Sequence, residues 1–234
     1  MNRITRKLIG KIKLLPPKRI ALSVNSVCNA HCLMCDIGQQ NGGFYEKMTP
    51  GGELSMETLT TLFDEVMSFK PEIAFNGTEP LLYKHLPQAI SEAKARGLKT
   101  TVTTNGILLA KRADELIESG LDNLAVSIDG PPSINEKVRG VKGISKLAEA
   151  GIAKMQGHCN VRVAMALSNY NDLVLFETAD RYHQLGVKHF TVSLLNWISK
   201  DMARAHNFKY ELLFGKVVPS GGKANPQAVF VQVV

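Results

Sequence analysis

Three of the four cysteines in this chain lie within eight residues of one another. Cys28, Cys32 and Cys35 form a CxxxCxxC pattern, which allows three thiolates to converge on one centre. Structural zinc sites and ferredoxin-type iron–sulfur clusters take four protein ligands. Either His31 or Cys159 supplies the fourth ligand here, or the metal centre keeps an open position. A reactive site needs such an opening, because a substrate or cofactor can occupy it.

The cysteines follow an apolar run at residues 20–24, which predicts a strand with the cysteines on the loop that leaves it. Strands and helices then alternate, with Ser55 as the N-cap of the first helix. The later helices are expected to end near residues 96, 119, 150 and 185. Further strands are expected at residues 72–75, 98–103, 123–126, 161–166 and 187–194. This alternation predicts an α/β fold with parallel strands, a partial (β/α)6 TIM-like barrel with fewer strands than a closed barrel.

Glycine followed by an aliphatic residue recurs where helices are expected to end. Glycine tolerates the left-handed conformation that closes a helix. Four such pairs predict four helix-to-strand turns, at Gly97, Gly120, Gly151 and Gly186.

Polar turns follow three of the predicted strands. They are residues 77–80 (Gly-Thr-Glu-Pro), 104–106 (Thr-Asn-Gly) and 127–130 (Ser-Ile-Asp-Gly). The carboxyl ends of parallel strands meet at one edge of the sheet, where active sites form in barrels of this kind. We therefore expect these turns to lie beside the cysteine loop.

The net charge of +7 is confined to the first 19 residues, and the rest of the chain has equal numbers of acidic and basic side chains. A neutral body argues against nucleic-acid binding as the main function. Three clustered cysteines indicate a reducing compartment, so we expect a cytoplasmic protein. We divide the chain into a basic segment 1–18, a core domain 19–214 and a C-terminal segment 215–234.

Both terminal segments leave alternatives open. The basic segment has apolar residues at helical spacing, which suits either weak contact with an anionic membrane surface or a helix packed on the domain. A helix is expected at 199–214 and a strand at 228–234. The chain stops inside that strand, so it is either truncated or pairs its last strand elsewhere.

The ordered set of motifs resembles the radical S-adenosylmethionine (radical SAM) enzymes over about residues 20–195. The resemblance is greatest to the branch with the molybdenum-cofactor enzyme that acts on GTP and the peptide- and sulfatase-maturing enzymes. It implies an enzyme in which Cys28, Cys32 and Cys35 hold one 4Fe-4S cluster. S-adenosylmethionine would chelate the fourth iron. Reductive cleavage of S-adenosylmethionine then yields a 5′-deoxyadenosyl radical that abstracts hydrogen from a substrate. An electron donor such as flavodoxin or ferredoxin is implied as well.

The resemblance also implies residues that bind S-adenosylmethionine. These are Gly77, Thr78, Glu79, Asn105, Ser127, Asp129 and Met34. Thr78 departs from the family's second glycine, so either the fit is altered or its hydroxyl supplies a contact. Met34 stands where the family often has an aromatic residue, and its thioether can pack on adenine.

Several of these residues have two interpretations. Asn105 either lines the site or stabilises its turn, and Asp129 either faces the cofactor or caps a turn. Arg139 resembles a recurrent arginine of the family, but a solvated charge explains it equally well. His31 reads as a loop residue, and Cys159 as a structural free thiol away from the cluster.

No motif indicates the substrate or the residues that act on it. The alternative to an enzyme is a non-catalytic module that binds zinc or an iron–sulfur cluster, including an electron carrier. That alternative explains the cysteines but leaves the ordered turns unexplained.

Overall fold

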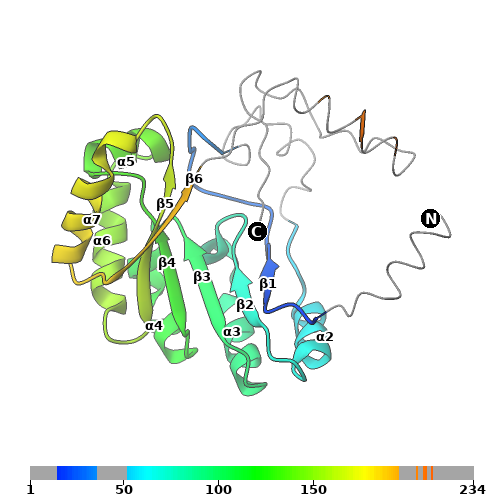
Figure 1. The fold of residues 1–234 in the computed structure, drawn as a ribbon. Helices are drawn as coiled ribbons and strands as arrows, with labels where there is room; N and C mark the ends of the chain where they lie inside the picture. Colours follow the sequence, from blue (N-terminus) through cyan, green and yellow to red (C-terminus); the bar gives the residue numbers. More distant parts are fainter. Residues whose placement is uncertain (1–14, 36–51, 195–203, 205–207, 210–211, 213–234) are drawn as a thin grey trace.

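The computed structural model describes residues 15–35 and 52–194, with residues 204, 208, 209 and 212. The described residues form a six-stranded parallel sheet whose strands lie in chain order (Figure 1). The strands are β1 (Arg19–Leu22), β2 (Glu72–Phe75), β3 (Thr100–Thr104), β4 (Asn123–Ser127), β5 (Asn160–Leu167) and β6 (His189–Leu194). The predicted partial barrel of parallel strands is confirmed.

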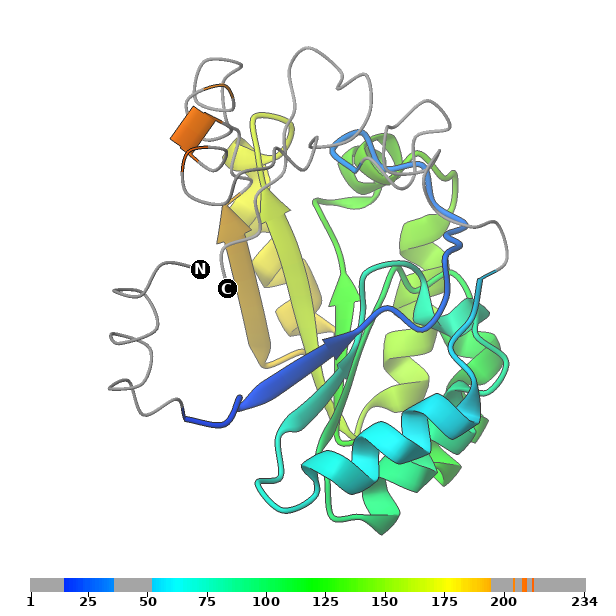
Figure 2. The same cartoon turned by 90° about the vertical axis from the view of Figure 1, so that its right-hand side faces the viewer.

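Helices cover the outer face of the curled sheet (Figure 2). They are α2 (Met56–Val66), α3 (Leu86–Ala95), α4 (Leu109–Glu118), α5 (Pro132–Arg139), α6 (Ile144–Met155) and α7 (Leu175–Gln184). Short 3-10 helices lie at Pro80–Leu82 (η2) and Asp172–Val174 (η3). Ser55 caps α2 as expected, because its hydroxyl accepts a hydrogen bond of 3.1 Å from the Thr58 N–H.

The hydrophobic core lies between the helices and the outer face of the sheet. Successive side chains of a strand point to opposite faces. Ile73 and Phe75, Leu124 and Val126, and Val161 and Val163 are buried in this core. The residues that alternate with them therefore form the inner face, which the helices do not cover. Small or polar residues of β3–β5 lie on that face, namely Thr101, Thr103, Ala125, Ser127, Arg162 and Ala164.

The single helix expected before residue 150 is two helices. Gly140 and Gly143 have φ values of +68° and +76°, which interrupt the helical path between α5 and α6. The break is a local consequence of two glycines three residues apart. It leaves the carboxyl end of α5 available to the cysteine loop.

The prediction that Gly151 ends a helix was wrong. Gly151 lies inside α6, and a Cβ atom there would come 2.5 Å from Leu109 Cγ of α4. This glycine therefore permits close helix packing. After α6, Gly157 adopts the left-handed conformation, with φ +82°. The other three predicted turns are confirmed by positive φ values at Gly97, Gly120 and Gly186.

The terminal predictions fall mostly outside the described residues. These include most of the basic segment 1–18 and all of the segment 215–234 with its predicted strand, so the division into domains stays a prediction. Four residues of the expected helix at 199–214 are described, and all four are helical. Among the described helices, none has the length and apolar character needed to cross a membrane.

Candidate active site

The cysteine loop is docked on the carboxyl end of α5. The His31 N–H donates to the Arg139 carbonyl at 3.0 Å, and the Leu33 N–H donates to the Val138 carbonyl at 2.8 Å. A Cβ atom on Gly140 would lie 2.4 Å from the His31 carbonyl oxygen, so only glycine allows this approach. The loop therefore takes its position from a helix about a hundred residues later in the chain.

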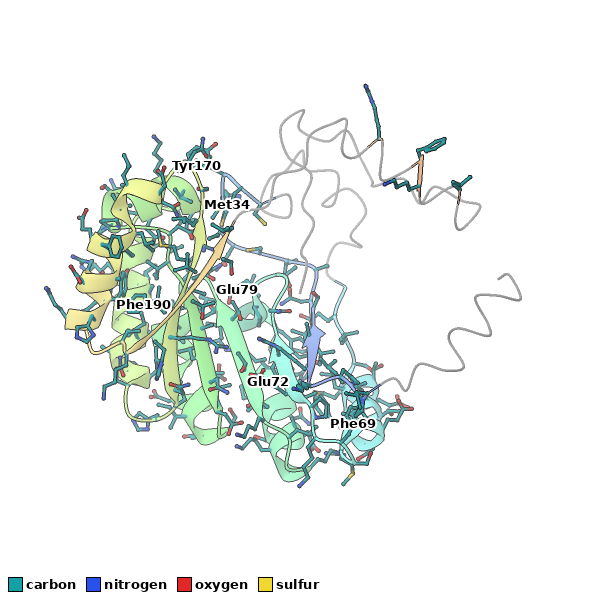
Figure 3. All side chains as sticks on the ribbon, viewed as in Figure 1. Met34, Phe69, Glu72, Glu79, Tyr170 and Phe190 are labelled. Carbon is teal, nitrogen blue, oxygen red and sulfur yellow. The ribbon has the colours of Figure 1, made fainter. Side chains whose placement is uncertain are left out.

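A small apolar cluster shields the thiols. Ala30, Cys32, Met34 and Val138 are buried together, and Cys28 and Cys35 are partly buried against them. Cys32 is 7% exposed. Met34 is thus packed within the loop's own cluster, at the same end of the sheet as Glu79 (Figure 3).

Two polar side chains reach the thiols. Asn105 Nδ2 donates to Cys28 Sγ at 3.9 Å, and Arg139 Nη1 donates to Cys32 Sγ at 3.8 Å. Burial raises the pKa of Cys32 to about 11, against the opposing effect of the Arg139 charge. Burial also raises the pKa of Cys28, while a hydrogen bond from the Ala30 backbone lowers it. The charge of Cys35 raises the pKa of both Cys28 and Cys32, and the charge of Cys28 also raises the pKa of Cys32.

The three thiols are not gathered closely enough to hold one metal ion together. In the described ranges, no three His, Cys, Asp or Glu side chains form a group that could hold one metal ion. The cysteines of a cubane cluster can stand farther apart, because each binds a separate iron. Cys159 precedes β5 at the amino edge of the sheet, whereas the cysteine loop lies at the carboxyl edge, so Cys159 is no fourth ligand.

Glu79 ties the turn after β2 to the turn after β3. Its side chain is buried and accepts hydrogen bonds from Leu81 N–H (3.0 Å), Thr104 Oγ1 (2.6 Å) and Asn105 N–H (2.8 Å). Burial raises the pKa of Glu79, and these donors oppose the shift. A carboxylate has about four acceptor positions. Three are used within the protein, which leaves Oε2 one position for a ligand.

The turn that contains Thr78 is clamped by Asn25. Thr78 Oγ1 lies 2.6 Å from Asn25 Oδ1 and 2.9 Å from the Asn25 carbonyl oxygen, and Asn25 Nδ2 donates to the Glu79 carbonyl at 2.9 Å. Gly77 has φ +92°, and a Cβ atom there would lie 2.0 Å from Ser23 Oγ. The left-handed residue is therefore Gly77. The Thr78 hydroxyl contacts Asn25 inside the protein.

Asn105 stabilises its own turn and also contacts the cysteine loop. Its Oδ1 accepts from the Ile107 N–H at 3.0 Å, which stabilises the turn after β3. Its Nδ2 donates to Asn29 Oδ1 at 2.8 Å and reaches Cys28 Sγ, which holds the cysteine loop. Asn105 thus links the third strand to the cysteine loop.

Asp129 is fully buried and paired with Arg139. Its Oδ1 accepts from the Ala166 N–H at 2.8 Å, and its Oδ2 lies 2.6 Å from Arg139 Nε. The Arg139 side chain is only 12% exposed, so the interpretation as a solvated charge was wrong. Asp129 positions Arg139, and Arg139 in turn reaches Cys32.

Ser127 differs from these residues. It ends β4 on the inner face of the sheet and is partly exposed. Within the described part of the chain, its hydroxyl has no hydrogen-bond partner. It is therefore available to a ligand at the carboxyl edge.

The sequence reasoning missed Asn25, Asn29 and Asn171. Asn171 Nδ2 donates to the carbonyls of Asp129 (3.0 Å) and Ala166 (2.9 Å), and so joins the turns after β4 and β5. One available signal was that each asparagine lies shortly after a predicted strand, among residues that form turns.

Comparison with known proteins places this geometry in a family. The sequence model of the Radical SAM superfamily matches residues 22–194, and the chain belongs to that superfamily. It is 35% identical over 131 residues to an Fe-coproporphyrin III synthase of Methanosarcina barkeri. The aligned region covers 55% of this chain and 31% of that relative. It is 33% identical over 150 residues to a probable GTP 3′,8-cyclase of Methanococcus aeolicus, with 58% and 47% covered.

The fold also matches solved structures. Streptococcus suis SuiB bound to S-adenosylmethionine superposes with a TM-score of 0.62 at 16% identity, over 91% of this chain and 52% of that chain. The chain thus spans about a third to a half of the length of these proteins. At this identity the structural likeness supports the fold alone. The evidence for a site comes instead from this chain's own cysteine pattern and polar turns.

Proposed function

We propose that this chain binds one 4Fe-4S cluster through Cys28, Cys32 and Cys35 and binds S-adenosylmethionine at the iron that lacks a protein ligand. The main support is the three-cysteine loop, which contacts Arg139 and Asn105 at the carboxyl edge of the sheet. When bound, these cofactors supply a 5′-deoxyadenosyl radical that removes a hydrogen atom from a substrate.

The residues around the cysteine loop have different roles in binding S-adenosylmethionine. The remaining acceptor position of Glu79 suits the ammonium group of S-adenosylmethionine, and the free hydroxyl of Ser127 suits its polar groups. Gly77 and Thr78 set the turn that carries Glu79. Asn105 holds the cysteine loop, and Met34 packs within the apolar cluster of that loop.

Arg139 contributes a fixed positive charge next to Cys32. A buried cation beside a cysteine ligand favours the electron-rich form of a cluster, since net charge and hydrogen bonds to sulfur set its potential. Asp129 keeps the guanidinium in place through the 2.6 Å ion pair. We assign Asp129 a positioning role toward the site in place of direct contact with the cofactor.

The reaction also needs a reductant and a substrate. A small electron-transfer protein such as flavodoxin or ferredoxin suits the first role. Relatives named for GTP cyclisation and for coproporphyrin chemistry indicate that related chains serve different substrates.

The test is anaerobic reconstitution with iron and sulfide, followed by dithionite and S-adenosylmethionine. We expect about four irons per chain and release of 5′-deoxyadenosine. Cys32→Ala should lose both, while Cys159→Ala, a matched loss of one thiol at the other edge, should keep both. Zinc in place of iron would contradict the proposal. Iron without 5′-deoxyadenosine, when a known radical SAM enzyme works beside it, would indicate an electron carrier.

A further inference from the structure

Arg112 of α4 donates hydrogen bonds to the backbone of the segment that follows Glu79. Its Nη1 donates to the carbonyls of Leu81 (2.6 Å) and Tyr83 (2.8 Å), and its Nη2 donates to the Lys84 carbonyl at 3.4 Å. These carbonyls belong to η2 and to the two residues after it. The last carbonyls of a helix have no partner inside that helix. One guanidinium therefore caps η2 from a different helix.

The Arg112 side chain is itself fixed in position. It is only 12% exposed, and its Nε pairs with Glu115 on the next turn of α4. The donors of a guanidinium lie in one plane and form a rigid fork. The orientation of this fork therefore determines where the end of η2 lies relative to α4.

Leu81 connects this cap to Glu79. Its carbonyl accepts the hydrogen bond from Arg112, and its N–H donates to Glu79 Oε1 at 3.0 Å. Leu81 is fully buried, so water does not replace either partner. A shift of the Leu81 backbone would move the carboxylate that is bound to it. Arg112 is thus linked to the Glu79 carboxylate through a single residue.

The turns after β2 and β3 are joined at two points. The Glu79 carboxylate reaches from the first turn to Thr104 and Asn105 at the end of β3. The helix α4 follows that second turn, and its Arg112 reaches back to η2. With one link, η2 could rotate about the carboxylate. The second link removes that freedom and fixes the direction of the remaining acceptor position on Glu79 Oε2.

Arg96 provides a comparison for a cap that serves stability alone. It lies at the end of α3, near the amino edge of the sheet, and its side chain is 19% exposed. It donates to the Glu92 carbonyl and pairs with the carboxylates of Glu92 and Asp64. Arg96 and Arg112 are therefore similarly buried, but only Arg112 is connected to the candidate site.

We propose that Arg112 is a positioning residue for S-adenosylmethionine: through Leu81 it fixes the direction of the Glu79 acceptor position that receives the ammonium group. The inference rests on the proposed function, because Arg112 acts through Glu79. Arg112 does not bind the cofactor itself. Four of its five donors are used within the protein, two on Nη1, one on Nη2 and one on Nε.

Equilibrium binding of S-adenosylmethionine to the reconstituted, unreduced protein tests this role, together with the kinetics of 5′-deoxyadenosine formation. Arg112→Gln should weaken the affinity and raise KM about fivefold to tenfold, with kcat changed by less than about twofold, because binding is lost and the cluster is untouched. Arg112→Lys keeps the charge but loses the fork, so it should recover part of the affinity. Arg96→Gln should lower the melting temperature and keep the wild-type affinity.

Hydrogen exchange of the cluster-free protein measures the position of η2 without the cofactor. The Leu81 amide reports its own bond to Glu79 Oε1. In Arg112→Gln this amide should exchange about tenfold faster than in the wild type, because local opening becomes easier. Arg96→Gln should leave it unchanged. If Arg112→Gln does not fold, Arg112→Lys is used in both measurements.

Three results would overturn the inference. They are an unchanged affinity in the Arg112 variant, an equal loss of affinity in Arg96→Gln, and an unchanged exchange rate of the Leu81 amide. Wild-type protein that forms 5′-deoxyadenosine, beside an Arg112 variant with the same KM, removes this inference alone. Wild-type protein that neither binds S-adenosylmethionine nor forms 5′-deoxyadenosine removes the proposed function, and this inference with it.

Discussion

The two sides of the candidate site differ in how completely their polar groups are paired. On the side of β1–β3, Asn25, Thr78 and Glu79 form a set of hydrogen bonds that leaves one acceptor position, on Glu79 Oε2. On the side of β4 and β5, Ser127 and Arg162 have no partner within the described ranges. The first side is therefore a frame whose geometry is set before any ligand arrives. The second side offers groups that a ligand or water must satisfy.

Burial explains the difference. Asn25 and Glu79 are nearly inaccessible, and buried polar groups are almost always hydrogen-bonded in folded proteins. Ser127 and Arg162 keep partial exposure on the inner face, so they can remain unpaired. Substitutions should therefore cost mainly folding stability on the first side and mainly binding on the second.

The largest effect is expected for Glu79→Gln. An amide replaces one acceptor oxygen by a donor, so at least one of the three donors at Glu79 loses its partner in a buried place. We expect a loss of about 3–5 kcal/mol in the free energy of unfolding, measured by chemical denaturation of the cluster-free protein. Glu92→Gln, which breaks a surface ion pair with Arg96, should cost less than about 0.5 kcal/mol. Equal losses of unfolding free energy in the two variants would contradict the structural role of Glu79.

Arg139→Gln should have the next largest effect, on both stability and redox potential. It leaves the buried Asp129 carboxylate without its cation, at a cost of about 2–4 kcal/mol in unfolding free energy. Loss of the positive charge beside Cys32 should lower the cluster midpoint potential by tens of millivolts, on the order of one factor of ten in reduction equilibrium.

A redox titration followed by electron paramagnetic resonance measures that potential. Arg139→Lys keeps the charge and should restore most of the potential but less of the stability, because lysine cannot reproduce the fork. An unchanged potential in Arg139→Gln would show that the arginine is only structural.

Ser127→Ala should separate binding from stability. The hydroxyl has no partner among the described residues, so the unfolding free energy should change by less than about 0.5 kcal/mol. S-adenosylmethionine should bind about fivefold to tenfold more weakly to the reconstituted protein. Ser119→Ala provides the reverse control, because its buried hydroxyl donates to the Leu116 carbonyl at 2.7 Å, far from the site. That variant should lose stability and keep its affinity for the cofactor.

The smallest effect is expected at Cys159, which belongs to neither side. Burial raises the pKa of its thiol to about 11, against an ordinary value of 9.0. Only the thiolate is alkylated, so at pH 8 its reaction with iodoacetamide should be about 100-fold slower than that of an unperturbed thiol. The rate should rise about tenfold per pH unit until pH 11.

The measurement uses reconstituted protein, in which the other three thiols are bound, with urea-unfolded protein as the reference. Fast alkylation at pH 8 would contradict the buried position of Cys159. Cys159→Ala should keep its iron and its 5′-deoxyadenosine yield, which would restrict the cluster to the carboxyl edge.

Much of the fold was predictable because its signals are local. Alternating strands and helices, the Ser55 cap and three glycine turns depend on residues close in sequence, and all were confirmed. Gly151 has the same local pattern as the other three glycines, but it packs against Leu109 of another helix. That contact is non-local, so the repeat pattern gave the wrong interpretation.

The sequence by itself determined the six parallel strands, the three-cysteine loop and the edge of the sheet on which the polar turns gather. Each of these follows from periodicity, spacing or the polarity of parallel strands. Only the tertiary structure showed which groups Thr78, Asn105 and Arg139 contact, because their partners lie 53, 76 and 107 positions away in the chain. Pairing over such distances depends on how the helices and strands pack. The same packing determines which polar side chains are hydrogen-bonded within the protein and which stay available to a ligand.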